Sequence, residues 1–129
     1  MPVEIQMLVC SVALYLLMIA VQGTAGVMQM GVTKALGNRD DVPPATGFAA
    51  RAKRNVSNFI ESLTLFAPLA LATVVTHEAD KQSALGSTIY LYARIAYSLC
   101  YLVGIPYLRT LCWAAGIAGT ILVGFSLFS

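Results

Sequence analysis

The chain has 129 residues, of which 58% are apolar and 11% are charged, and its mean hydropathy is +0.76. Soluble domains are about 45–50% apolar and about 25% charged, so this composition excludes an ordinary water-soluble fold, a disordered chain and a nucleic-acid-binding arm. The net charge of +2 is too small to indicate a partner. We therefore expect an integral membrane protein that binds no nucleic acid.

Four apolar segments have the length of membrane-spanning helices. One helical span takes about 20 residues, so four spans use roughly 80 residues and leave no room for a separate soluble domain. The amino terminus has no basic residue before its apolar run, so we expect the first segment to be a retained span and not a cleaved signal peptide. The sequence predicts an all-α four-helix bundle, a single domain over residues 1–129. The spans are predicted at about 3–30, 54–77, 83–103 and 106–128.

Helix-breaking residues separate these segments. Pro43-Pro44 lies in the one long polar connection, after which a helix is expected to begin near Gly47. The sequence Gly104-Ile105-Pro106 predicts a tight turn with proline at a helix start.

Lys and Arg gather on one side of the predicted bundle. Six of them lie near the span ends that share the long connection and the turn at 104–106: Lys34, Arg39, Arg51, Lys53, Arg54 and Arg109. By the positive-inside rule this side is expected to face the cytoplasm, with both termini on the opposite side.

The sequence predicts no metal site. Cys10, Cys100 and Cys112 lie in apolar stretches and lack the paired spacing of a zinc site or a disulfide framework, so we expect reduced packing residues. His77 falls in a short charged turn, where a solvated loop residue is the simplest interpretation.

Two helices carry polar stripes at membrane depth. In the second span Arg51, Arg54, Asn58 and Glu61 follow i, i+3, i+7 and i+10, which places them along one helix face. A charge at the bilayer centre costs about 2.5 to 3.5 kcal/mol, so such residues are expected to face the bundle interior or a polar cavity.

The third span repeats the pattern with Tyr90, Arg94, Tyr97 and Tyr101, and the fourth begins with Arg109. One interpretation is structural: Glu61 pairs with Arg94, and the other cations contact lipid phosphates. The alternative is a shared cavity in which four arginines against one glutamate leave about three positive charges uncompensated. Such a cavity would bind an anion with carboxylate or phosphate groups, and Glu61 and Asn58 are the acceptors available for an amine.

The same segments resemble a known family, the membrane-associated proteins in eicosanoid and glutathione metabolism (MAPEG), which includes microsomal glutathione transferases. The segment RAKRNVSNFIE, Arg51 to Glu61, is similar to the family's R-x-x-R-x-x-x-N-x-x-E stretch. Two further matches are YLYARIAYSLCY, Tyr90 to Tyr101, and PYLRTLCW, Pro106 to Trp113. The resemblance covers essentially the whole chain.

The resemblance implies a homotrimer of four-helix subunits that binds glutathione, as a co-substrate, between adjacent subunits on the cytosolic side. The implied binding residues are Arg51, Arg54, Asn58, Glu61, Arg94, Tyr97 and Tyr101. Arg109 matches the arginine that stabilises the glutathione thiolate, which is the catalytic role. The implied reactions are conjugation of the thiolate to apolar electrophiles that arrive through the lipid, or reduction of lipid hydroperoxides.

Within this match Arg54 corresponds to the arginine that meets the carboxylates of the tripeptide, and Asn58 and Glu61 to the residues near its glutamyl amine. Lys34 corresponds to a basic residue at the end of the first helix. The sequence departs from better-known members at Val56, Ser57 and Ser62.

These departures leave transferase, peroxidase, isomerase and no catalysis open. The alternatives from other classes are a small four-helix membrane transporter and a noncatalytic membrane scaffold. In the transporter type the functional glutamate lies in the first span, whereas here that span has no acid after Glu4.

Overall fold

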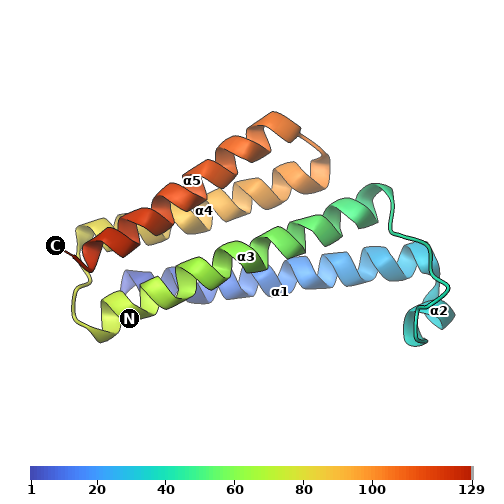
Figure 1. The fold of residues 1–129 in the computed structure, drawn as a ribbon, viewed down its shortest axis with the longest axis horizontal. Coiled ribbons are helices and arrows are strands. Elements are labelled where there is room, and N and C mark those ends of the chain that lie inside the picture. The colour runs from blue at the N-terminus through green and yellow to red at the C-terminus, as the bar shows by residue number, and fades with distance from the viewer. Residues whose placement is uncertain (129) are drawn as a thin grey trace.

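The computed structural model describes residues 1–128, and within that range every regular element is a helix. In chain order these are α1 (Val3–Met30), α2 (Val32–Leu36), α3 (Gly47–Val75), α4 (Lys81–Val103) and α5 (Pro106–Ser126) (Figure 1). The all-helical prediction is confirmed. Ser129, the last residue of the predicted domain, lies outside the described residues.

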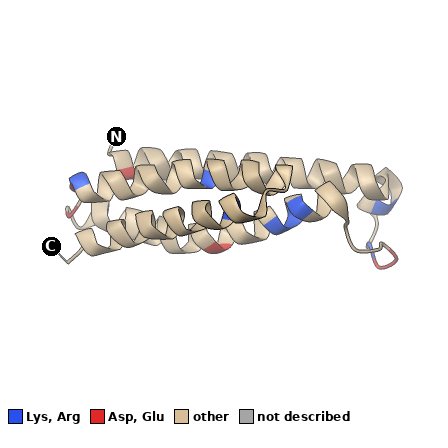
Figure 2. Ribbon diagram, turned by 90° about the horizontal axis from the view of Figure 1, so that it is seen from above, with Lys and Arg blue, Asp and Glu red and all other residues tan. Residues whose placement is uncertain are grey.

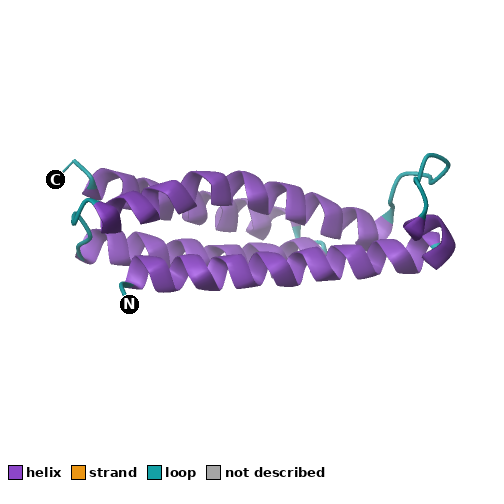
Figure 3. Ribbon diagram, turned by 90° about the horizontal axis from the view of Figure 1, so that it is seen from below, coloured by secondary structure: helices purple, strands orange, loops and turns teal. Residues whose placement is uncertain are grey.

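The four long helices run side by side and define two ends of the molecule (Figure 3). Both chain termini and the α3–α4 turn lie at one end, here called the terminal end. The short helix α2, the connection that follows it and the α4–α5 turn lie at the other, here called the loop end. In Figure 1 the α4–α5 hairpin and the α1–α3 pair diverge toward the loop end.

Three helices, α1, α3 and α5, are long and apolar enough to cross a membrane. The predicted span at 83–103 falls in α4, which is not among them. The reason is composition, because α4 carries polar residues along its length, among them Ser87, Arg94 and Ser98, which are each at most 1% exposed. These polar residues make α4 less apolar as a sequence, although they face the interior of the bundle.

Aromatic packing joins α3 to α4 in the core. Phe59 and Phe66 of α3 are fully buried, and the ring of Phe66 stacks on Tyr90 of α4 with centroids 4.1 Å apart. The Tyr90 hydroxyl and the Ser62 hydroxyl are hydrogen-bonded at 2.9 Å. This contact satisfies a polar group that would otherwise be costly to bury.

The α4–α5 hairpin is packed backbone to backbone near the terminal end. A Cβ added at Gly119 would lie 2.6 Å from the Gly86 carbonyl oxygen, and one at Gly86 would lie 2.5 Å from that of Gly119. At the other end of the hairpin Gly104 adopts a left-handed conformation and ends α4, and Pro106 begins α5 as predicted.

A set of hydrogen bonds closes the terminal end, and we call it the terminal polar network (Glu4, Asp80, Ser83 and Ser126). Asp80 caps α4 by accepting from the Ser83 backbone N–H at 2.9 Å. Ser126 donates to Asp80 at 3.1 Å, and Ser83 donates to the buried carboxylate of Glu4 at 3.1 Å. The backbone N–H of Ser83 is the main cause that holds the pKa of Asp80 below its usual value.

At the loop end Gln29 fixes where α3 begins. Its amide nitrogen donates to the Thr46 hydroxyl at 2.7 Å, and its amide oxygen accepts from the Thr46 backbone N–H at 3.1 Å. These bonds tie the first turn of α3 to the end of α1, and so they position the arginines that follow. The helix α2 was not predicted, because its five residues lie within the polar connection.

Candidate functional site

Two arginines from different helices meet one tyrosine near the loop end. The Nε of Arg54, on α3, donates to the Tyr101 hydroxyl at 3.1 Å, and the Arg109 guanidinium, on α5, lies 4.5 Å from the centre of the Tyr101 ring. Tyr101 is 9% exposed, whereas Arg54 is exposed and Arg109 is half-buried. We call these three residues the arginine–tyrosine cluster.

A second layer lies deeper along the same helices. The Nη1 of Arg94 donates to the Asn58 side-chain oxygen at 3.0 Å. The Arg94 guanidinium lies 4.2 Å from the centre of the Tyr97 ring and 4.7 Å from that of Phe59. Tyr97 in turn meets Tyr101 edge to face, with centroids 5.5 Å apart. Part of each predicted stripe therefore joins into one continuous set of contacts, formed by Arg54 and Asn58 of α3 and by Arg94, Tyr97 and Tyr101 of α4.

Arg51 contacts the end of α4. Its Nε donates to the Leu102 carbonyl oxygen at 3.4 Å, and its guanidinium lies beside Gly104 and 6.0 Å from the centre of the Phe48 ring. A cation at a helix C-terminus interacts favourably with the helix dipole and the free carbonyls there. Arg51 therefore has a structural role that accounts for its position.

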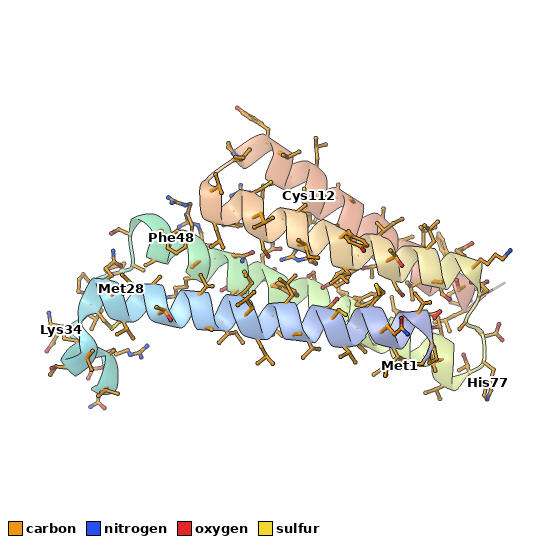
Figure 4. The ribbon with its side chains drawn as sticks, turned by 180° about the vertical axis from the view of Figure 1, so that it is seen from behind. Met1, Met28, Lys34, Phe48, His77 and Cys112 are labelled. Atoms are coloured by element: carbon orange, nitrogen blue, oxygen red, sulfur yellow. The ribbon has the colours of Figure 1, made fainter. Side chains whose placement is uncertain are left out.

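Glu61 and Lys34 stand apart from these contacts. Glu61 is exposed and close enough to Tyr97 for an electrostatic interaction, but among residues 1–128 no hydrogen bond joins it to Arg94. The structural pairing of Glu61 with Arg94 is thus not formed. Lys34 is exposed on α2, at the far tip of the loop end (Figure 4).

Asn55, which was not among the predicted site residues, lies inside the α3–α4 interface. It is 1% exposed, its side-chain oxygen accepts from Ser98 at 3.4 Å, and its amide nitrogen has no partner among the described residues. The available signal was a second asparagine three residues before Asn58 on an otherwise apolar face. Ser98, four residues after Arg94, carried the matching signal on α4.

An apolar groove opens between α1 and the start of α3. Its volume is about 810 Å³, and Val21, Thr24, Met28, Gln29 and Phe48 are among the residues that line it. Met28 and Phe48 lie near one another at the loop end in Figure 4. Cavities of roughly 300–1,000 Å³ with mostly apolar walls and a few polar groups are typical of small-molecule sites.

Positive charge dominates this half of the molecule. Figure 2 shows the Lys and Arg residues mostly between the middle of the bundle and the loop end. Lys81 is the first residue of α4 and so follows the α3–α4 turn at the terminal end. Among the contacts of the described residues, Arg54, Arg94 and Arg109 interact with tyrosine, phenylalanine or asparagine side chains and with no carboxylate. Such a site is suited to an anionic ligand, because arginine pairs bidentately with carboxylate or phosphate.

Comparison with known proteins gives one family. The model of the MAPEG family matches residues 7–129, essentially the whole chain. No curated protein and no solved structure matches the chain. The matched range includes every predicted site residue.

Proposed function

This chain belongs to the MAPEG family, and on that premise we propose that it is a membrane-embedded enzyme that uses glutathione. Membership of the family points to membrane glutathione-transferase or peroxidase chemistry or to eicosanoid metabolism. The proposed reactions are transfer of the glutathione thiolate to an apolar electrophile and reduction of a lipid hydroperoxide.

The observation that carries this proposal is the arginine–tyrosine cluster. Arg54 and Arg109 come from helices that are far apart in sequence, yet both contact Tyr101, and neither has a carboxylate partner in the described chain. An anion bound beside both cations would gain charge-assisted hydrogen bonds from each of them. Glutathione has two carboxylates and an ionisable thiol, so it supplies such an anion.

Arg109 has the catalytic role in this proposal. A thiol with a pKa of about 8.5 is mostly protonated at neutral pH, whereas the thiolate is the nucleophile. A half-buried guanidinium beside the sulfur favours the anion, and the thiol proton passes to solvent. In conjugation the sulfur lone pair forms the C–S bond with the electrophile, which either releases its leaving group with the bonding electron pair or, where it is an epoxide or an activated double bond, takes up the electron pair and then a proton from solvent. In the peroxidase reaction two glutathione molecules and a hydroperoxide give glutathione disulfide, an alcohol and water.

The apolar groove supports the same function by offering space for the second substrate. It adjoins Arg51 through Phe48, which lines the groove and lies under the Arg51 guanidinium. A lipid-soluble electrophile that enters there would approach the charged site from the membrane.

The proposal also includes the assembly and its orientation. We propose that α4 forms a fourth span, that three copies assemble with surrounding lipids, and that the loop end faces the cytoplasm. The large apolar residues exposed on α1 and α5, such as Leu16, Leu111 and Phe125, fit contact with lipid or with a neighbouring subunit. In such an assembly the half-exposed site would be completed by an adjacent subunit.

Glutathione binding to the purified protein in detergent micelles tests the proposal. We expect binding by isothermal calorimetry, a loss of at least tenfold in affinity for Arg54→Ala, and unchanged affinity for Lys53→Ala. Lys53 is a suitable control because it is the exposed neighbour of Arg54 and carries the same charge. Absence of binding at millimolar glutathione, or equal effects of both substitutions, would instead favour the transporter or the scaffold.

A further inference from the structure

The buried arginine of α4 has a single directed contact. Arg94 is 1% exposed, and its guanidinium is held between the rings of Phe59 and Tyr97. Its Nη1 donates to the Asn58 side-chain oxygen at 3.0 Å, while its Nε and Nη2 have no partner among the described residues. A ligand outside the bundle therefore meets Asn58 before it meets Arg94.

The chemistry of the guanidinium fixes which way the Asn58 amide points. Arginine has only donors, so the asparagine atom that faces Arg94 must be the carbonyl oxygen. The amide nitrogen is on the other branch of the side chain and faces away from Arg94. This assignment follows from the chemistry of the two groups and does not depend on telling oxygen from nitrogen by position.

Asn58 lies on the α3 face that carries both neighbouring charges. Arg54 is four residues before it and Glu61 is three residues after it, so the three side chains follow one another along the helix. Asn58 is half-buried, and its side-chain oxygen is occupied by the hydrogen bond from Arg94. The group of this side chain that is left to meet a ligand is therefore the amide N–H donor.

We propose that Arg94 is a positioning residue that makes Asn58 a donor, so that Asn58 binds a carboxylate or amide carbonyl oxygen of the ligand. The inference rests on the proposed function. It departs from the expectation that Asn58 and Glu61 both accept from the glutamyl amine. In this arrangement Glu61 alone accepts from the ammonium group.

The first test uses no ligand. Asn58→Asp keeps an oxygen for Arg94 and adds a negative charge beside the buried guanidinium, whereas Asn58→Leu keeps the size and removes the acceptor. We expect a thermal midpoint for Asn58→Asp equal to or above that of the wild type, and a lower one for Asn58→Leu. Equal destabilisation by both substitutions would overturn the Arg94–Asn58 contact.

The second test compares glutathione with its analogue that lacks the glutamyl amino group, by calorimetry. Asn58→Asp should weaken both ligands, and the deaminated analogue by at least tenfold, because an acceptor replaces the donor that faced a ligand oxygen; the loss for glutathione is smaller, since the added charge attracts its ammonium group. Glu61→Gln should weaken glutathione only. If Asn58→Asp strengthens glutathione binding, or affects only the ligand that has the amine, the donor role is overturned.

Arg94 itself is tested through ligand preference. In Arg94→Met the amide of Asn58 is free to turn its oxygen outward and accept from the amine, so the preference for glutathione over the deaminated analogue should increase. Arg94→Lys keeps a donor for Asn58 and should retain the wild-type preference. A purely structural role would weaken both ligands equally, and that result would reject the positioning role.

Failure of the proposed function can be distinguished from failure of the donor role of Asn58 by the binding measurements on the wild type. If the wild type binds neither ligand, the function is wrong and the donor role toward glutathione falls with it. The ligand-free comparison of Asn58→Asp and Asn58→Leu still decides whether Arg94 fixes Asn58.

Discussion

The two ends of the bundle both contain polar clusters, but only in the cluster at the terminal end do the charged groups have complementary partners within the chain. In the terminal polar network the carboxylates of Glu4 and Asp80 accept from the hydroxyls or backbone of Ser83 and Ser126. In the arginine–tyrosine cluster two cations meet one tyrosine. The carboxylates of the terminal polar network therefore have hydrogen-bond donors within the same chain. The arginine–tyrosine cluster has two positive charges and no carboxylate among its contacts.

This difference indicates that the polar cluster at the terminal end stabilises the fold, whereas the cluster at the loop end is suited to bind a ligand. A polar group that already has its partner contributes to the fold, because a lost partner leaves it desolvated and unpaired. An arginine whose contacts are only aromatic or neutral can still be stabilised by an ion pair with a bound anion. We therefore expect substitutions at the terminal end to lower stability, and substitutions at the loop end to lower ligand binding or activation with little effect on stability.

The largest effect is expected for Arg109→Ala. If Arg109 lowers the pKa of the bound thiol by about two units, its loss removes about 2.7 kcal/mol of thiolate stabilisation, or about a hundredfold in thiolate population. The ultraviolet absorbance of thiolate should disappear from the complex, while much of the glutathione affinity and the thermal midpoint remain. Arg109→Lys should keep part of the signal. Unchanged thiolate absorbance in the alanine variant would reject the role.

The sequence predicted the loop-end cluster better than the terminal network, for a physical reason. The i, i+3, i+7, i+10 spacing in the second span and the i, i+4, i+7, i+11 spacing in the third placed Arg54 and Tyr101 on defined helix faces, and the short turn before Pro106 brought the start of α5 beside them. The Glu4–Ser83 bond joins residues 79 positions apart. No local pattern predicts such a contact, because it depends on how whole helices pack.

The sequence also did not predict which neighbouring side chain Arg94 contacts or how deeply it is buried. The stripe on α4 included Arg94, but spacing does not show that its guanidinium is 1% exposed and turned toward Asn58. Similarly, hydropathy marks α1, α3 and α5 as apolar enough to cross a membrane and omits α4. Burial of the polar residues of α4 is a property of the assembled bundle.

The next largest effect is expected where the terminal half is packed most closely. Gly119→Ala would place a Cβ 2.6 Å from the Gly86 carbonyl oxygen, so the α4–α5 hairpin must separate, at a cost of about 2 kcal/mol. Gly23→Ala is the matched control, since nothing lies within 4 Å of its added Cβ and alanine favours a helix. Thermal unfolding in detergent should show a lower midpoint for the first and an equal or higher midpoint for the second. The reverse order would refute the close packing.

A smaller effect is expected within the terminal polar network. Ser83→Ala removes the donor to Glu4 and one half of the capping box of α4, for a loss of about 1 kcal/mol. Ser87→Ala is its control: Ser87 is also fully buried, one turn further along α4, but its hydroxyl has no partner in the described chain. We expect Ser87→Ala to be neutral or stabilising by chemical denaturation, and equal losses in both variants would show that the network contributes nothing.

The smallest effect is a pH dependence that belongs to the terminal end. The pKa of Asp80 is lowered in the folded protein, chiefly by the backbone N–H of Ser83, from an ordinary value of 3.8. The ionised carboxylate therefore stabilises the folded state above that value, and the contribution is lost as the pH falls through the lower, folded pKa. Wild type and Asp80→Asn should differ in thermal midpoint near pH 6 and converge on acidification below about pH 4. A difference that stays constant with pH would mean that the charge of Asp80 is not what holds α4 and α5 together at this end.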